Sequence, residues 1–169
     1  TEELGTYPQL RIYAPEAITT LAQFLRSKYP RFLGSEYAVT EDEREDLYPI
    51  PVEDIQALTL PTGSFDAVVT CDVLEHIPDV KAALREMHRI MAPGGVMLST
   101  FPFTWKPDSR VQARLLDGEL LHLTSPEYHG NPASPESGSL VFTVPGWEIL
   151  EWARVAGFSR VEMIMMASG

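Results

Sequence analysis

The fold is decided by residues 64–101, which read SFDAVVTCDVLEHIPDVKAALREMHRIMAPGGVMLSTF. Residues 65–71 form an apolar, β-branched run that is too short for a helix and predicts a buried strand. Asp79 is a good N-cap for a helix that ends before Pro93-Gly94-Gly95, and a second apolar strand then runs to Phe101. The helix places its apolar residues on one face: Val80, Leu84, Met87 and Met91.

Strand, helix and strand in this order predict a βαβ unit with parallel strands. Open α/β sheets bind ligands at the carboxyl ends of their strands. Polar and acidic residues follow the first strand at once, so residues 71–76 are expected to face a ligand.

The whole chain fits this unit. Its 169 residues suit a single α/β domain, and hydrophobic residues make up 44% of them. The net charge of −11 argues against partners such as nucleic acid or an anionic membrane. A single cysteine, Cys71, excludes an internal disulfide and favours a reducing compartment, so we expect a cytoplasmic protein. No apolar run approaches the roughly 18 residues of a membrane span, and no signal-peptide pattern opens the chain.

The predicted fold class is α/β: a Rossmann-like, mainly parallel sheet with helices on both faces. Further helices are expected at residues 15–28 and from Pro145 to Ala156, the latter closed by Gly157. Residues 102–139, rich in proline and glycine, are expected to form an inserted lid or substrate segment with a short helix at 109–116. Strands are predicted near residues 10–14, 32–36, 50–53, 65–71, 95–101 and 159–166.

Three motifs in register resemble a known family. They are LPTGSFD at residues 60–66, DVLEHIPD at 72–79 and ALREMHRIMAPGG at 83–95. This series resembles class I S-adenosylmethionine-dependent methyltransferases of the small-molecule type. The resemblance implies that S-adenosylmethionine is the cofactor and that a small or medium-sized acceptor receives the methyl group by in-line displacement.

The resemblance also implies a cofactor loop after the first strand. The family places glycines there, because glycine lets the backbone approach the cofactor closely. This chain has Ala14, Pro15 and Glu16 instead and no glycine, so we interpret the loop as a modified cofactor-binding loop.

By the same resemblance, acids at the strand ends bind the cofactor. Glu36, after the second strand, is expected to accept hydrogen bonds from the ribose diol, and its alternative is a solvated glutamate. Asp54 and Ile55 are expected to meet the adenine, whereas Asp54 could instead cap a turn. Cys71 and Asp72 would line the cofactor near its methionine end.

Two histidines are candidate catalytic residues. His76 is suited to act as a general base, because the histidine pKa lies near neutrality, although a structural role is an equal alternative. His129 lies in the lid segment, with Trp105 as a second candidate wall of the acceptor site. The histidines show no metal-ligand spacing along the chain, so no metal site is predicted.

Alternatives remain open at this stage. The chain could be a non-catalytic methyltransferase-like module that binds a ligand or partner, or, less in keeping with its motifs, a nicotinamide-binding Rossmann domain. The resemblance covers residues 9–166 and looks clipped at both ends. Either the chain is a fragment, or a partner covers the exposed sheet edge, as in a homodimer.

Overall fold

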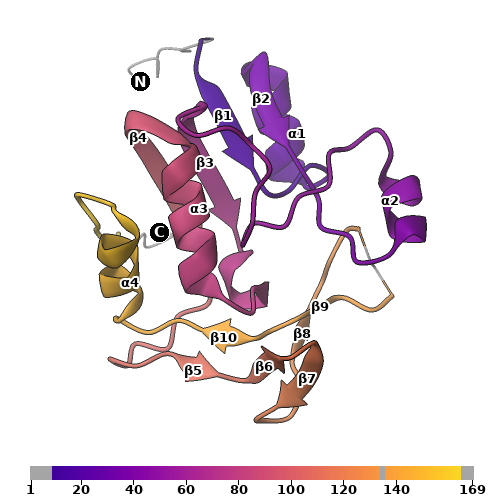
Figure 1. Cartoon of the computed structure of the whole chain (residues 1–169), viewed down its shortest axis with the longest axis vertical. Coiled ribbons are helices and arrows are strands. Elements are labelled where there is room, and N and C mark those ends of the chain that lie inside the picture. Colours follow the sequence, from indigo (N-terminus) through magenta and orange to yellow (C-terminus); the bar gives the residue numbers. More distant parts are fainter. Residues whose placement is uncertain (1–8, 134–135, 165–169) are drawn as a thin grey trace, which may run out of the picture.

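A parallel four-stranded sheet forms the centre of the computed structural model, which describes residues 9–133 and 136–164 (Figure 1). Its strand order is β2-β1-β3-β4. All three neighbouring pairs are parallel, with Tyr13 opposite Val68 and Val68 opposite Met97. The strands are β1 (Arg11–Ala14), β2 (Arg31–Gly34), β3 (Phe65–Cys71) and β4 (Met91–Thr100). The predicted parallel α/β sheet is therefore confirmed.

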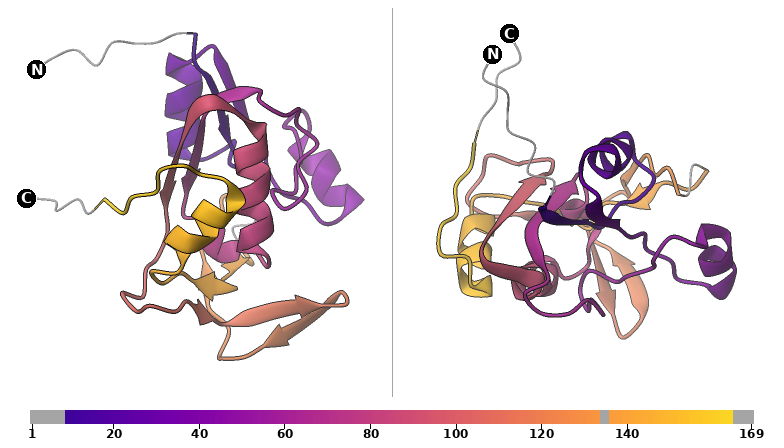
Figure 2. Two further views of the ribbon diagram at one scale, coloured as in Figure 1. Left: turned by 60° about the vertical axis from the view of Figure 1, so that its left-hand side comes forward. Right: turned by 90° about the horizontal axis from the view of Figure 1, so that it is seen from above.

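Helices cover both faces of this sheet (Figure 2). α1 (Thr20–Lys28) connects β1 to β2, and α3 (Val80–Ile90) connects β3 to β4. The two connections run in opposite directions across the sheet, and right-handed crossovers therefore place the two helices on opposite faces. α4 (Ile149–Ala156) lies beside α3 and ends at Gly157, whose φ of 116° is in the left-handed region.

The main core lies between α3 and the sheet. The Asp79 side chain accepts a hydrogen bond from the Ala82 amide at 2.9 Å, so the predicted N-cap is confirmed. Met87 and Ile90 are fully buried against Tyr13 and Val68 of the strands. The apolar face of α3 therefore fixes the helix on the sheet, and the carboxyl end of β3 is held rigidly as a consequence.

Two predicted strands are wrong over the residues that the structure describes. Residues 50–53 give only an isolated parallel bridge between Val52 and Glu36, because Pro49 before this stretch and Pro51 within it have no amide hydrogen to donate. Residues 159–164 form no strand, although Val161 packs against the core. The alternation of apolar residues there reflects the packing of side chains on the core, whereas the backbone of these described residues pairs with no strand. Residues 165 and 166 lie outside the described residues.

Residues 102–144, here called the ribbon segment, leave the carboxyl end of β4. The segment forms three antiparallel two-stranded ribbons. The short helix predicted at 109–116 is wrong, because strands β5 (Arg110–Val111) and β6 (Ala113–Leu116) lie there. Asp117 and Gly118 both have positive φ, at 50° and 83°, and close a tight hairpin with the twist that antiparallel strands require. The ribbons pair β5 with β10 (Thr143–Val144), β6 with β7 (Glu119–His122), and β8 (Tyr128–His129) with β9 (Ser139–Leu140).

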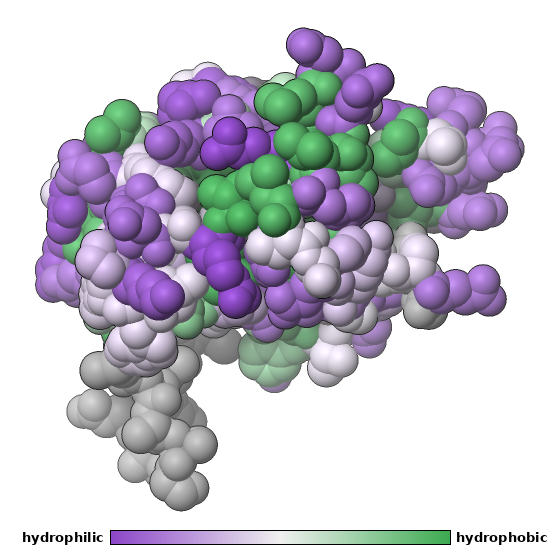
Figure 3. Space-filling model, turned by 90° about the horizontal axis from the view of Figure 1, so that it is seen from below, coloured by the Kyte–Doolittle hydropathy of each residue, from purple (hydrophilic) through white to green (hydrophobic). Residues whose placement is uncertain are grey.

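Apolar side chains are exposed on the β6–β7 hairpin and at one edge of the sheet, among other places. The β6–β7 hairpin leaves its leucines about half exposed, and Figure 3 shows hydrophobic side chains gathered among polar ones at this end of the molecule. At the edge of the sheet, Val96 and Leu98 of β4 are more than half exposed. The expected partner over this edge stays a prediction.

The remaining helix is short and solvated. α2 (Glu41–Leu47) has no buried residue and is held by a capping box between Thr40 and Glu43. Among the helices that the structure describes, none is long and apolar enough to cross a membrane.

Candidate active site

The candidate active site begins at a strained turn after β3. Asp72 has a φ of 53°, a left-handed conformation that is uncommon outside glycine. Its amide donates to the Thr100 carbonyl at 3.0 Å, and the Thr100 hydroxyl donates to the Asp72 carboxylate at 3.2 Å. The end of β4 therefore holds the turn in place. The chain continues into a short 3₁₀ helix, η1 (Leu74–His76), which carries two polar side chains at the strand end.

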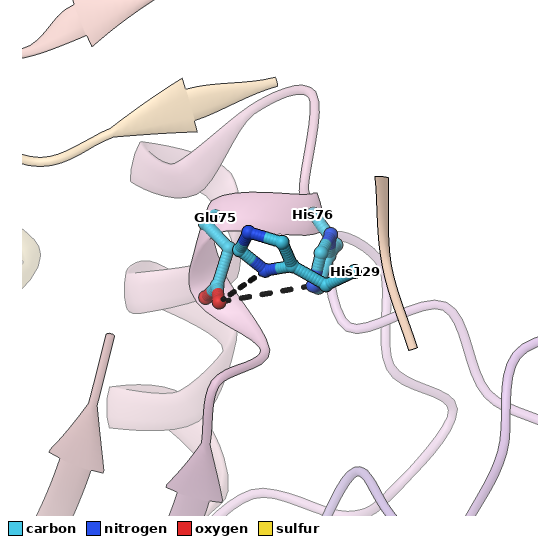
Figure 4. Close-up of side chains that lie close together, drawn as sticks. All are labelled: Glu75, His76 and His129. Atoms are coloured by element: carbon cyan, nitrogen blue, oxygen red, sulfur yellow. Dashed lines mark ion pairs between the residues drawn. The ribbon is translucent and has the colours of Figure 1, made fainter. Parts of the chain in front are cut away.

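Glu75 is fully buried at this strand end. Neither of its carboxylate oxygens has a hydrogen-bond partner among the residues that the structure describes. Two histidines lie close to this carboxylate: Oε1 is 3.5 Å from His129 Nδ1 and 3.7 Å from His76 Nε2 (Figure 4). The two imidazole rings meet edge to face, with centroids 5.1 Å apart. Glu75, His76 and His129 therefore form a compact cluster, although His129 comes from the ribbon segment.

The protonation of this cluster is shaped by burial. Burial raises the pKa of Glu75, and the nearby Asp72 carboxylate raises it further. Burial also lowers the pKa of His76. The His76 Nδ1 lies 2.9 Å from the Leu140 carbonyl, which can only accept, so Nδ1 carries the proton in neutral His76. The unprotonated Nε2 then faces Glu75.

A cavity of about 500 Å³ opens beside the cluster. Its walls combine the ends of β3 and β4 with the ribbon segment, so it lies where open α/β sheets bind ligands. The lining residues are Asp72, Glu75, His76, Phe101, Pro102, His129 and Gly130. Of the two residues proposed for the acceptor wall, His129 lines the cavity. Trp105 does not: it packs against Phe103 and Trp147 and is 61% exposed.

The predicted cofactor loop follows β1. Ala14 is fully buried in the sheet, and Pro15 leads into Glu16, which is only 5% exposed. The Glu16 carboxylate accepts from the Cys71 amide at 3.0 Å and from the Thr19 hydroxyl at 2.6 Å. The loop is thereby tied to the end of β3 by an internal carboxylate, where the family has glycines.

Glu36 lies at the end of β2, as predicted. One of its oxygens, Oε1, accepts from the amides of Ala17 at 2.7 Å and Ile18 at 3.2 Å, so the carboxylate holds the turn that precedes α1. Both bonds go to the same oxygen. The side chain is half-buried, and its second oxygen, Oε2, takes no part in these two hydrogen bonds.

The predicted adenine residues take mainly structural positions. Asp54 accepts from the backbone and side-chain amides of Gln56, at 2.9 and 3.0 Å, which is the turn-capping alternative. Ile55 is 5% exposed and belongs to the main core. Cys71 is half-buried and Asp72 is exposed at the rim of the cavity.

The sequence patterns assigned no site role to the wall residues Phe101 and Pro102 or to the neighbouring acid Glu127. Phe101 and Pro102 directly follow β4, so their place at a strand end could have been predicted. Nothing local in the sequence distinguishes Glu127, which lies 3.4 Å from His129 Nε2.

Comparisons with known proteins agree with this architecture. The family model described as a methyltransferase domain matches residues 30–99, from β2 to β4. A structure of an S-adenosylmethionine-dependent methyltransferase from Mesorhizobium loti superposes with a TM-score of 0.55 at 16% identity, over 92% of this chain and 77% of that one. The structure of a [4+2]-cyclase, SpnF, superposes with a TM-score of 0.53 at 17% identity. The match covers 88% of this chain and 51% of that one. The Rossmann-like fold is therefore confirmed.

Sequence relatives share the central segment. A ubiquinone biosynthesis O-methyltransferase from Xanthomonas oryzae pv. oryzae (strain PXO99A) is 43% identical over 74 residues, which are 43% of this chain and 28% of that protein. An uncharacterized methyltransferase from Mycobacterium sp. (strain KMS) is 26% identical over 136 residues, covering 73% of this chain and 54% of the relative. The matched regions thus span from about a quarter to about half of these two curated relatives. The resemblance to class I methyltransferases is confirmed.

Proposed function

Because the chain is related to class I S-adenosylmethionine-dependent methyltransferases, we propose that it binds S-adenosylmethionine and transfers its methyl group to a small or medium-sized acceptor. The observation that carries this proposal is the cavity at the carboxyl ends of β3 and β4, within and directly after the matched segment. When bound, the cofactor supplies an electrophilic methyl group on a sulfonium and leaves as the neutral thioether.

Carboxylates at neighbouring strand ends fit such a cofactor. Glu36 offers Oε2 to the two hydroxyls of a ribose, since its other oxygen already accepts from backbone amides. Asp72 is exposed at the cavity rim and suits the cationic amino group of the methionine end, with Cys71 beside it. In this proposal residues 14–16 form the floor of the cofactor cleft, and Asp54 and the backbone amide of Ile55 meet the adenine.

The acceptor would enter the cavity from the side of the ribbon segment. Methyl transfer from a sulfonium needs chiefly an in-line arrangement of the acceptor atom, the methyl carbon and the sulfur. His76 lines the cavity and its Nε2 carries no proton in the neutral ring, so it is suited to take a proton from a hydroxyl or amine acceptor. His129, in edge-to-face contact with His76, lines the same part of the cavity and orients the acceptor.

Calorimetric titration of the purified chain with S-adenosylmethionine tests the proposal. We expect saturable binding at one site with a dissociation constant in the micromolar range. Mass spectrometry of acceptor mixtures should then show products heavier by one methylene unit. If the cofactor does not bind, the chain is a non-catalytic module. Binding without a methylated product would favour another reaction on the same fold, because fold alone does not fix activity.

A further inference from the structure

The geometry points to a divalent-cation site of the zinc type, formed by Glu75 Oε1, His76 Nε2 and His129 Nδ1. The inference that the site binds a cation is independent of the proposed function. The role of the cation in acceptor binding, however, rests on the proposed function. Spacings along the chain predict no metal site, because these ligands come from two distant segments and meet only in the folded protein.

The buried carboxylate is the first argument. Glu75 is completely buried, and neither oxygen has a hydrogen-bond partner among the residues that the structure describes. A buried polar group without a partner costs free energy, and a charged one costs far more. A cation bound between Glu75 and the two histidines would supply the missing partner.

The spacing of the donor atoms is the second argument. Metal–ligand bonds of about 2.0–2.1 Å at tetrahedral angles place neighbouring donor atoms roughly 3.3 Å apart. The Glu75 oxygen lies 3.5 Å from His129 Nδ1 and 3.7 Å from His76 Nε2. One donor atom from each residue lies within 4.8 Å of the others, so small side-chain shifts complete the arrangement.

The far nitrogen of each ring is the third argument. His76 Nδ1 is bonded to the Leu140 carbonyl at 2.9 Å, which turns the bare Nε2 inward. His129 Nε2 lies 3.4 Å from the Glu127 carboxylate, whose other oxygen accepts from Gln112 at 2.8 Å. Metal-binding histidines almost always donate their other N–H to a carbonyl or carboxylate, and both rings here have such an acceptor.

The ligand set selects the kind of cation. Two imidazole nitrogens and one carboxylate suit zinc and its first-row neighbours, whereas magnesium and calcium prefer oxygen ligands throughout. Because the protein supplies three ligands and all three residues line the cavity, a fourth position is left for a ligand from the cavity. In the proposed enzyme this position would take a hydroxyl oxygen of the acceptor and lower its pKa, so that its proton is released to solvent. His76 would then act as a ligand, in place of the base role that the proposed function gives it.

Metal binding without cofactor or acceptor tests the site. Chelator-treated protein is titrated with zinc chloride by calorimetry, and with cobalt chloride by visible absorption, which reports the ligand geometry. We expect one zinc ion per chain, and visible cobalt bands of a four- or five-coordinate site. Absence of stoichiometric zinc binding by the wild-type chain would overturn the proposal.

Matched variants locate the site. His129→Ala should abolish stoichiometric binding, whereas His122→Ala, on the exposed hairpin strand β7, should bind as the wild type does. Glu127→Gln keeps all three ligands and should weaken zinc binding about 10- to 100-fold, as expected for an outer-shell partner. Equal binding by His129→Ala and the wild type would contradict the assignment. Half-exposed His129 can be replaced without opening the core, so the test does not depend on a Glu75 variant.

A parallel titration with S-adenosylmethionine separates the two proposals. Cofactor binding without zinc binding would refute the metal site and leave the proposed function standing. Zinc binding without cofactor binding would refute the proposed function and leave the metal site standing.

Discussion

The parallel sheet and the ribbon segment contribute to the same cavity but are built on different principles. The sheet and α3 bury a contiguous core in which Tyr13, Val68, Met87 and Ile90 are fully buried. The ribbon segment consists of short two-stranded pairings and leaves leucines of its β6–β7 hairpin about half exposed. In the proposed function, the well-packed sheet is the platform that binds the cofactor, and the ribbon segment is the wall that meets the acceptor.

Replacing part of the ribbon segment should have the largest effect, which is on methyl-transfer activity. Replacement of residues 126–133 by a short glycine-serine linker removes His129 and β8, and should abolish turnover. Cofactor affinity should stay within about threefold, a difference under ~1 kcal/mol, because the strand ends remain. Full activity of this variant on an acceptor that the wild type methylates would show that the ribbon segment is not an acceptor wall.

A core substitution tests the platform. Met87→Ala empties a fully buried position of α3 and should lower the free energy of unfolding by about 2–5 kcal/mol, measured by urea denaturation. Arg85→Ala, on the exposed face of the same helix, is the matched control and should change it by less than about 0.5 kcal/mol. Similar effects of the two substitutions would contradict the packing described for α3.

The sheet was largely predictable because its signals are local. The run from Phe65 to Cys71 is short, apolar and β-branched, and β3 has these bounds. The Asp79 cap and the apolar face of α3 also follow from neighbouring residues. Where pairing depends on a distant strand, the same patterns failed: Val161 is packed against the core without a ladder.

The ribbon segment and the histidine cluster were only partly predictable. The Asp-Gly pair at 117–118 between apolar runs is a strong hairpin signal and could have corrected the helix at 109–116. In contrast, the approach of His129 to Glu75 depends on the pairing of β8 with β9 and on the Leu140 carbonyl that holds His76. No local pattern specifies these contacts between distant segments.

A turn substitution sharpens the contrast in the ribbon segment. Gly118 has a φ of 83°, which side-chain-bearing residues rarely adopt, so Gly118→Val should destabilise the hairpin by about 1–3 kcal/mol. Because the hairpin is not part of the main core, the protection of core amides against hydrogen exchange should change little while that of β6 and β7 falls. Equal loss of protection in β3 would show that the two regions unfold together.

The smallest effect concerns an ion pair of the sheet. The Arg11 guanidinium and backbone amide lower the pKa of Asp66 to about 2 from 3.8. A carboxylate whose pKa is lower in the folded than in the unfolded chain stabilises the fold at pH values above its unfolded-state pKa. This stabilisation is lost as the pH falls from about 4 to about 2. The free energy of unfolding of Asp66→Asn should therefore lie below that of the wild type at pH 6, and the two should converge near pH 2. A constant difference over this pH range would rule out the pair as its cause.

In the proposed function the strand ends bind the cofactor and the ribbon segment meets the acceptor. Calorimetric titration of S-adenosylmethionine into Glu36→Ala and His129→Ala, beside the wild type, tests it most directly. Loss of the charge-assisted bond from Glu36 should weaken binding by about 1.5–3 kcal/mol, or roughly 10- to 150-fold. His129→Ala should stay within about threefold of the wild type. Unchanged affinity in Glu36→Ala together with a large loss in His129→Ala would contradict the account.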